Sequence, residues 1–125
     1  MKLLLIEDDR FFSKFYSNKL KEYNIETETA VDGEEGLLKM KTWSPDIVLL
    51  DLIMPKKDGF FVLKERQKLA SLLKIPVIVL STLGQEKDLE IVQKLGANDY
   101  VNKGFFNFDL VMEKIIRLTN KSKLT

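Results

Sequence analysis

Short, unbroken runs of apolar residues recur along this chain, separated by longer segments in which apolar residues return every three or four positions. The four runs are Leu3–Ile6, Ile47–Leu50, Val77–Leu80 and the weaker Tyr100–Val101. Unbroken runs of this length are typical of strands that are covered on both faces of a sheet. The segment Ile25–Ala30 instead alternates glutamates with less polar residues, which predicts a strand at the edge of the sheet.

The segments between these strands have helical spacing of apolar residues. Helices are predicted at residues 9–22, 32–41, 58–73, 84–95 and 106–119. Asp9 is suited to cap the start of the first helix, and Gly96 to end the fourth. Strands and helices therefore alternate five times, which predicts an α/β fold with one doubly wound parallel sheet, right-handed crossovers and helices on both faces.

Length and composition fit one globular domain. The chain has 125 residues, of which 45% are hydrophobic, and residues 1–120 are expected to form the domain, with 121–125 as a frayed C-terminal tail. The net charge of +1 gives no electrostatic reason to expect nucleic acid or a membrane surface as a partner. No apolar run is long enough for a signal peptide or a membrane span, and there is no cysteine, so a cytoplasmic location is expected.

The chain contains neither cysteine nor histidine. This excludes Ser-His-Asp and Cys-His nucleophilic catalysis and makes a zinc site a poor fit. A metal site in this chain has to be built from oxygen atoms, which favours Mg²⁺, Mn²⁺ or Ca²⁺. Any phosphohistidine has to come from a partner protein.

Polar residues follow each of the four apolar runs. They are Glu7 and Asp8 after the first run, Asp51 after the second, Ser81 and Thr82 after the third, and Asn102 and Lys103 after the fourth. Ligands of open α/β sheets bind at the carboxyl ends of the strands, where the strand order reverses. The sequence therefore predicts a polar site at this edge.

Three carboxylates meet at that edge if the first and third strands are neighbours, namely Glu7, Asp8 and Asp51. A pair of like charges 4–5 Å apart repels by roughly 3–4 kcal/mol at an effective dielectric constant near 20. Either one carboxylate stays protonated or a cation lies among them, and Mg²⁺ beside phosphate oxygens suits an oxygen-only site. With Lys103 and the Ser81 hydroxyl close by, the residues indicate phosphoryl transfer to Asp51.

Four stretches together carry a family resemblance: IEDD at 6–9, PDIVLLDLIMPKKDG at 45–59, PVIVLST at 76–82 and GANDYVNKGF at 96–105. In this order and spacing they resemble the CheY-like receiver domain of two-component response regulators, from Lys2 to about Leu118. The resemblance implies a flavodoxin-like sheet with strand order 2-1-3-4-5.

The resemblance also implies the metal site. Asp51 would be the phosphoacceptor, Asp8 would bind Mg²⁺ directly, and Glu7 would bind it largely through water. Ile53 would contribute its backbone carbonyl, and Mn²⁺ is a possible substitute for the ion.

The remaining implied roles concern switching and partners. Ser81 would be the switch hydroxyl, Tyr100 the aromatic residue that turns with it, and Lys103 the ammonium that contacts the phosphoryl group. A sensor histidine kinase or a histidine phosphotransfer protein would donate the phosphoryl group. A downstream protein would bind the face of the fourth helix, fifth strand and fifth helix, and the domain would be no enzyme beyond its own phosphorylation and dephosphorylation.

Three features depart from the family pattern, and one is that Ile53 and Leu83, which flank the site, offer no polar group to orient an attacking water. Gly104 replaces the usual proline after the lysine, so a trans peptide is expected there, and Thr82 occupies a position that is commonly small. Gly104 leaves open an alternative, a pseudo-receiver that binds partners without phosphorylation. This alternative is opposed by the full set of site residues, Glu7, Asp8, Asp51 and Lys103. A phosphatase of the haloacid-dehalogenase type is rejected, because such enzymes need an acid where this chain has Ile53.

Overall fold

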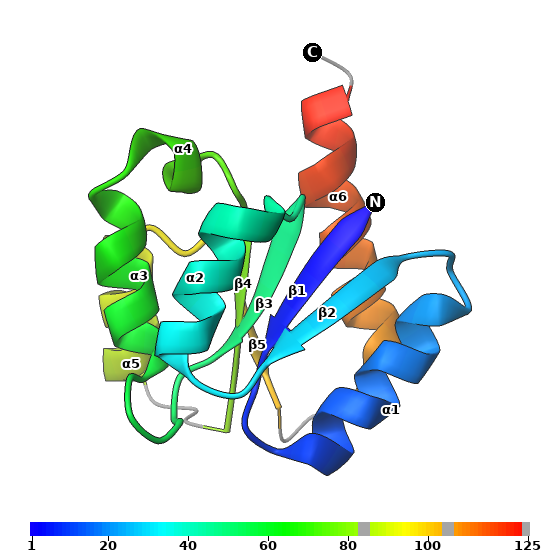
Figure 1. Cartoon of the computed structure of the whole chain (residues 1–125), viewed down its shortest axis with the longest axis horizontal. Helices are drawn as coiled ribbons and strands as arrows, with labels where there is room; N and C mark the ends of the chain where they lie inside the picture. Colours follow the sequence, from blue (N-terminus) through cyan, green and yellow to red (C-terminus); the bar gives the residue numbers. More distant parts are fainter. Residues whose placement is uncertain (83–85, 104–106, 124–125) are drawn as a thin grey trace.

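One five-stranded parallel sheet forms the centre of the molecule (Figure 1). The computed structural model describes residues 1–82, 86–103 and 107–123. The strands are β1 (Lys2–Ile6), β2 (Glu26–Ala30), β3 (Ile47–Asp51), β4 (Val77–Ser81) and β5 (Asp99–Asn102). Their order is β2-β1-β3-β4-β5, so the predicted strand order is confirmed, with β2 at one edge.

Helices cover both faces of the sheet. They are α1 (Arg10–Lys21), α2 (Gly33–Trp43), α3 (Gly59–Gln67), α4 (Ala70–Leu73), α5 (Glu86–Lys94) and α6 (Phe108–Lys123). Helices α1 and α6 lie on one face, whereas α2, α3 and α5 lie on the other (Figure 1). The predicted fourth and fifth helices correspond to α5 and α6.

The alternation of side chains along each strand divides the core into two parts. In β1, Leu3 and Leu5 pack in the cluster beneath α1 and α6, whereas Leu4 and Ile6 pack in the cluster beneath α2, α3 and α5. All four are fully buried. Burial on both faces explains why these strands are unbroken apolar runs in the sequence.

Local signals in the sequence set several helix ends. The Asp9 carboxylate accepts hydrogen bonds from the backbone N–H groups of Phe11 and Phe12, which confirms Asp9 as the cap of α1. Gly96 lies just after α5 with a φ of 91°, the left-handed conformation that glycine adopts without a steric penalty.

The prediction of one helix over residues 58–73 is wrong. The helix ends at Gln67, Leu69 is extended (φ −125°, ψ 117°), and a single further turn follows as α4. The physical reason is the buried side chain of Arg66, which donates hydrogen bonds to the carbonyls of Leu73 and Ile75. A continuous helix would carry these carbonyls away from Arg66.

The last helix is longer than the sequence predicts. Helix α6 ends at Lys123, four residues beyond the predicted end at 119. Leu118 is the last apolar residue of this helix in the sequence, and apolar spacing was the only signal that the prediction used. Fraying of 121–125 stays a prediction. No helix in the described part of the chain is long and apolar enough to cross a membrane.

Candidate functional site

Three carboxylates converge at the carboxyl edge of the sheet, the lower edge in Figure 1. Strands β1 and β3 are paired in parallel with Ile6 opposite Leu50, so Glu7 and Asp51, the residues that follow these two, emerge side by side. One oxygen atom from each of Glu7, Asp8 and Asp51 lies within 4.8 Å of the others. Glu7 and Asp51 are buried and Asp8 is exposed.

Lys103 provides the positive charge of this cluster. Its ammonium group forms an ion pair and a hydrogen bond with Glu7 and lies 3.8 Å from Oδ2 of Asp51. The Lys103 side chain is only 13% exposed. Its backbone N–H donates to the carbonyl of Ser81 at 2.9 Å, so the end of β4 fixes where this lysine enters the site.

The environment of Asp51 opposes its negative charge. Burial raises the pKa of the Asp51 carboxyl from 3.8 to about 7, with further upward contributions from the charge of Glu7, a hydrogen bond with Glu7 and the charge of Asp8. Lys103 lowers the pKa of Asp51 but does not offset the other effects. The cluster therefore needs more positive charge than Lys103 supplies.

A divalent cation fits this need. Three carboxylates and one ammonium leave two negative charges when all the groups are ionised, and every available donor atom is oxygen. This donor set suits Mg²⁺, which keeps several waters and takes few protein ligands. Glu7, Asp8 and Asp51 are close enough together to share one ion.

Of the two predicted switch residues, Ser81 lies beside this cluster at the end of β4, and Tyr100 is linked to Ser81. Ser81 is fully buried at the end of β4, and Tyr100 is half-buried on β5. Burial and the charge of Asp88 raise the pKa of Tyr100, while a side-chain hydrogen bond with Ser81 lowers it in part. The two side chains are therefore in contact, as a coupled movement would require.

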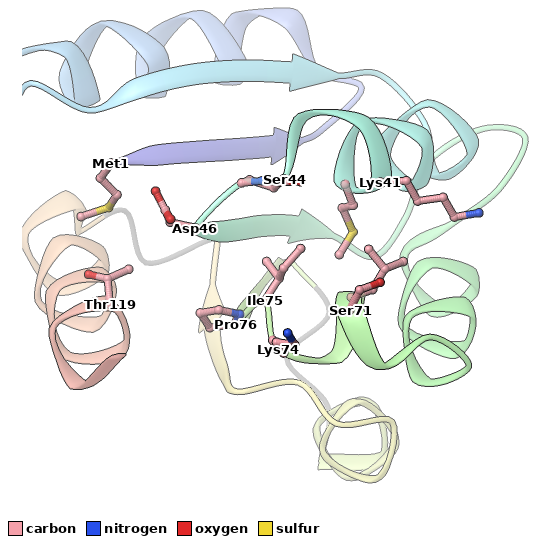
Figure 2. A pocket seen from close by; sticks show the side chains of 12 residues that line it. Met1, Lys41, Ser44, Asp46, Ser71, Lys74, Ile75, Pro76 and Thr119 are labelled. Carbon is pink, nitrogen blue, oxygen red and sulfur yellow. The ribbon is translucent and has the colours of Figure 1, made fainter. Parts of the chain in front are cut away.

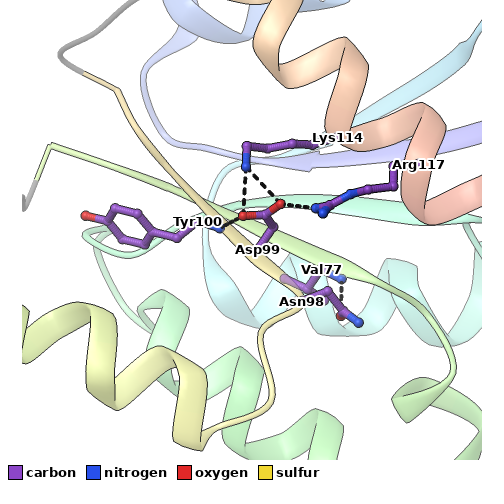
Figure 3. A network of polar contacts seen from close by, with 6 residues as sticks. All are labelled: Val77, Asn98, Asp99, Tyr100, Lys114 and Arg117. Carbon is purple, nitrogen blue, oxygen red and sulfur yellow. Dashed lines mark hydrogen bonds and ion pairs between the residues drawn. The ribbon is translucent and has the colours of Figure 1, made fainter.

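A separate polar network lies on the other side of Tyr100. The Asp99 carboxylate accepts hydrogen bonds from Lys114 at 2.9 and 3.0 Å and from Arg117, both on α6. It also accepts one from the Tyr100 backbone N–H at 2.8 Å. These contacts of Asp99 tie β5 to α6. Figure 3 shows that the Tyr100 ring is directed away from them.

Other predicted positions have less defined surroundings. Ile53 is 56% exposed, and the metal-binding role of its carbonyl stays a prediction. Thr82 is exposed just after β4. The expected trans peptide at Gly104 lies outside the described residues.

Sequence reasoning missed one neighbour of the site, Phe12. The Lys103 ammonium lies 4.3 Å from the centre of the Phe12 ring. A signal was available, because Phe12 is the third residue of α1, in the first turn after the acids that follow β1. The contact itself joins α1 to the residue that follows β5, and these lie far apart in the sequence.

Gly59 at the start of α3 allows a close approach to the end of β3. A Cβ atom there would lie 2.5 Å from the Asp51 carbonyl oxygen and 2.8 Å from Cα of Leu52. We expect Gly59→Ala to lower the free energy of unfolding by about 1–3 kcal/mol, because backbone has to move. Denaturant unfolding would measure this. Lys64→Ala, on the exposed face of the same helix, is the control, and an equal effect of both variants would contradict the close approach.

A different hollow opens at the opposite edge of the sheet. It has a volume of about 390 Å³ and is lined by residues that include Met1, Asp46, Lys74 and Thr119 (Figure 2). None of the carboxylates described above lines this hollow. The acidic cluster, with its charges and its lysine, is therefore the better candidate for chemistry.

Comparison with known proteins agrees with this arrangement. The family model of the response regulator receiver domain matches residues 3–116. A protein of Guillardia theta named "Probable transcriptional regulator ycf27" is 36% identical over 123 residues, which are 97% of this chain and 47% of that protein. The alkaline phosphatase synthesis transcriptional regulatory protein PhoP of Bacillus subtilis is 34% identical over 104 residues, 83% of this chain and 42% of its own length.

Solved structures show the same fold. The receiver domain of the Francisella response regulator 1452 has a TM-score of 0.87 at 32% identity, covering 97% of this chain and 98% of that one. Chemotaxis protein CheY4 of Vibrio cholerae has a TM-score of 0.86 at 26% identity, covering 94% and 97%. The chain belongs to the response-regulator receiver family, and it spans less than half the length of the curated relatives above.

Proposed function

We propose that this receiver domain accepts a phosphoryl group on Asp51 and that the modification changes a protein-binding surface. The observation that carries the proposal is the convergence of Glu7, Asp8 and Asp51 within 4.8 Å, with the Lys103 ammonium beside the carboxylates of Glu7 and Asp51. Two buried carboxylates beside a third, exposed one destabilise the fold unless a cation or a proton offsets their charge, and such clusters are common at functional sites.

The reaction forms a bond between an Asp51 carboxylate oxygen and phosphorus. The bond between phosphorus and the donor nitrogen of a phosphohistidine breaks, and the departing nitrogen keeps the electron pair. The Lys103 ammonium lies where it can contact oxygens of the transferring group. Asp51 needs no general base, because its ionised form is already the nucleophile.

Mg²⁺, held by Glu7, Asp8, Asp51 and the carbonyl of Ile53, would supply positive charge to the phosphoryl oxygens and to the carboxylates. Mn²⁺ could replace it, because its ligand preferences are similar. The residues of this chain align the acceptor oxygen and neutralise charge, as phosphoryl transfer mainly requires.

The donor has to carry the histidine, since this chain has none. A sensor histidine kinase or a histidine phosphotransfer protein fits that requirement. Phosphorylation would favour the state in which Ser81 is drawn to the phosphoryl group and Tyr100 turns with it. The affected surface is formed by α5, β5 and α6, where a downstream protein would bind.

Several relatives are named transcriptional regulators, but the matched residues cover only 47% and 42% of those proteins. The proposed absence of direct nucleic-acid binding concerns the receiver domain alone, whose net charge is +1. We assign it no other enzymatic activity than its own phosphorylation and dephosphorylation.

Phosphorylation by a small phosphodonor tests the proposal without knowledge of the kinase. Incubation with acetyl phosphate and Mg²⁺ should add one phosphoryl group, seen by intact-protein mass spectrometry, and chelation of Mg²⁺ should prevent it. Asp51→Asn should stay unmodified. The control is Asp46→Asn, one residue before β3 at the opposite edge of the sheet, which should behave as the native protein does. An unchanged native mass would favour the phosphorylation-independent pseudo-receiver.

A further inference from the structure

The ammonium of Lys103 has one contact that neither the metal nor the acceptor explains. It lies 4.3 Å from the centre of the Phe12 ring, on the α1 side of the site. The carboxylates of Glu7 and Asp51 contact the same ammonium. A cation within about 6 Å of an aromatic face is attracted by the negative potential of the ring, most strongly where water is excluded.

The Phe12 ring is itself held in place. It stacks on Tyr16 with ring centres 4.6 Å apart and an interplanar angle of 17°. Tyr16 is 3% exposed and packs edge-on against Phe108 of α6 at 5.5 Å. The Asp9 carboxylate fixes the Phe12 backbone N–H. The ring therefore has a defined orientation before Lys103 meets it.

We propose that Phe12 is a positioning residue for the phosphorylation of Asp51, because its ring holds the Lys103 ammonium beside the acceptor. This inference rests on the function proposed above. An aromatic face attracts a cation electrostatically, but unlike a carboxylate it does not accept strong hydrogen bonds from the N–H groups of that cation. Phe12 thus leaves the ammonium protons available to Glu7 in the resting state and to phosphoryl oxygens during transfer.

The contact matters more at this site because of how Lys103 is anchored. Its backbone N–H donates a hydrogen bond to the carbonyl of Ser81 at the end of β4, whereas its ammonium has to reach Glu7 and Asp51. The long side chain crosses to the β1–β3 edge and has rotamer freedom to lose. A ring that limits the positions of its ammonium reduces that loss in the transition state.

Rates of phosphorylation by phosphoramidate with Mg²⁺ test the role of Phe12. Phe12→Leu keeps an apolar side chain but removes the ring, and we expect its rate constant to fall by roughly 3- to 30-fold, the range of a cation–π contact. Phe12→Tyr keeps the ring and should retain most of the rate. Phe15→Leu is the matched control, because Phe15 also contacts Tyr16 but its ring lies by Lys19.

Two further comparisons separate positioning from packing. Phenylalanine analogues with one, two and three ring fluorines at position 12 should lower the rate stepwise, because fluorine weakens the ring potential while the shape is nearly kept. In a Lys103→Met background, Phe12→Leu should have no further effect on the rate.

The outcomes for the two proposals are distinct. Native protein that takes no phosphoryl group overturns the proposed function and, with it, the role of Phe12. Native protein that is phosphorylated while Phe12→Leu keeps the native rate overturns only the role of Phe12. The same holds if Phe12→Leu and Phe15→Leu slow the reaction equally, or if fluorination leaves the rate unchanged.

Discussion

Replacement of Arg66 by alanine is expected to lower the free energy of unfolding by roughly 3–5 kcal/mol. Arg66 is 2% exposed as a whole residue, and its guanidinium donates hydrogen bonds to the carbonyls of Ile75, Leu73 and Gly96 and to the side-chain oxygen of Asn98. Burial lowers its pKa. Truncation removes a charged donor from all these acceptors at once and leaves a cavity.

Chemical denaturation of the native protein and of Arg66→Ala measures this difference in the free energy of unfolding. Lys68→Ala is the matched control, since Lys68 lies two residues further along the chain with a 71% exposed side chain paired to Glu65. Its loss should stay below about 1 kcal/mol. Arg66→Lys should fall between the two, because one ammonium cannot reach every acceptor. A loss below about 1 kcal/mol in Arg66→Ala would show that these hydrogen bonds do not hold the fold together.

The second large effect is a dependence of stability on pH and magnesium. The pKa of Asp51 is raised from 3.8 to about 7 in the folded protein, so the folded state binds the Asp51 proton more tightly than the unfolded state does. Stability is therefore highest below pH 4 as far as Asp51 is concerned, and it falls as the pH rises to 7. Three pKa units correspond to a loss on the order of 4 kcal/mol above pH 7.

This loss should appear in unfolding experiments with a chelator present. Between pH 4.5 and 8 the native protein should lose stability relative to Asp51→Asn, which carries no ionisable group at this position. At pH 8, Mg²⁺ should raise native stability by about 1.4 kcal/mol for each tenfold excess over its dissociation constant. It should raise the stability of Asp51→Asn much less. Parallel pH profiles of the two proteins, without Mg²⁺, would contradict the raised pKa.

The strands and the acidic cluster could be predicted from the sequence because both depend on local pattern. A strand covered on both faces has to be an unbroken apolar run, as β3 is. A polar residue directly after such a run has to lie at the carboxyl edge of a parallel sheet. Asp51 is such a residue, because it follows the apolar run Ile47–Leu50 and is the last residue of β3. Glu7 and Asp51 thus meet because β1 and β3 are neighbours, an order that the family resemblance implied.

The features that the sequence did not predict depend on contacts between distant residues. The break between α3 and α4 follows from Arg66, whose acceptors lie up to 32 residues further along the chain. An arginine is usually exposed, so its burial cannot be deduced from residue type. The contact of Phe12 with Lys103 joins a residue on α1 to a residue that follows β5. From its residue type alone, Phe12 was expected to lie in the core.

The central claim is that Asp51 itself receives the phosphoryl group in a magnesium-dependent reaction. The most direct measurement is reduction of the phosphorylated protein with borohydride, which converts an aspartyl phosphate to homoserine, followed by peptide mass spectrometry. We predict homoserine at position 51 only when phosphodonor and Mg²⁺ are both present. Homoserine at another aspartate, or at position 51 in equal yield with Mg²⁺ chelated, would contradict the claim.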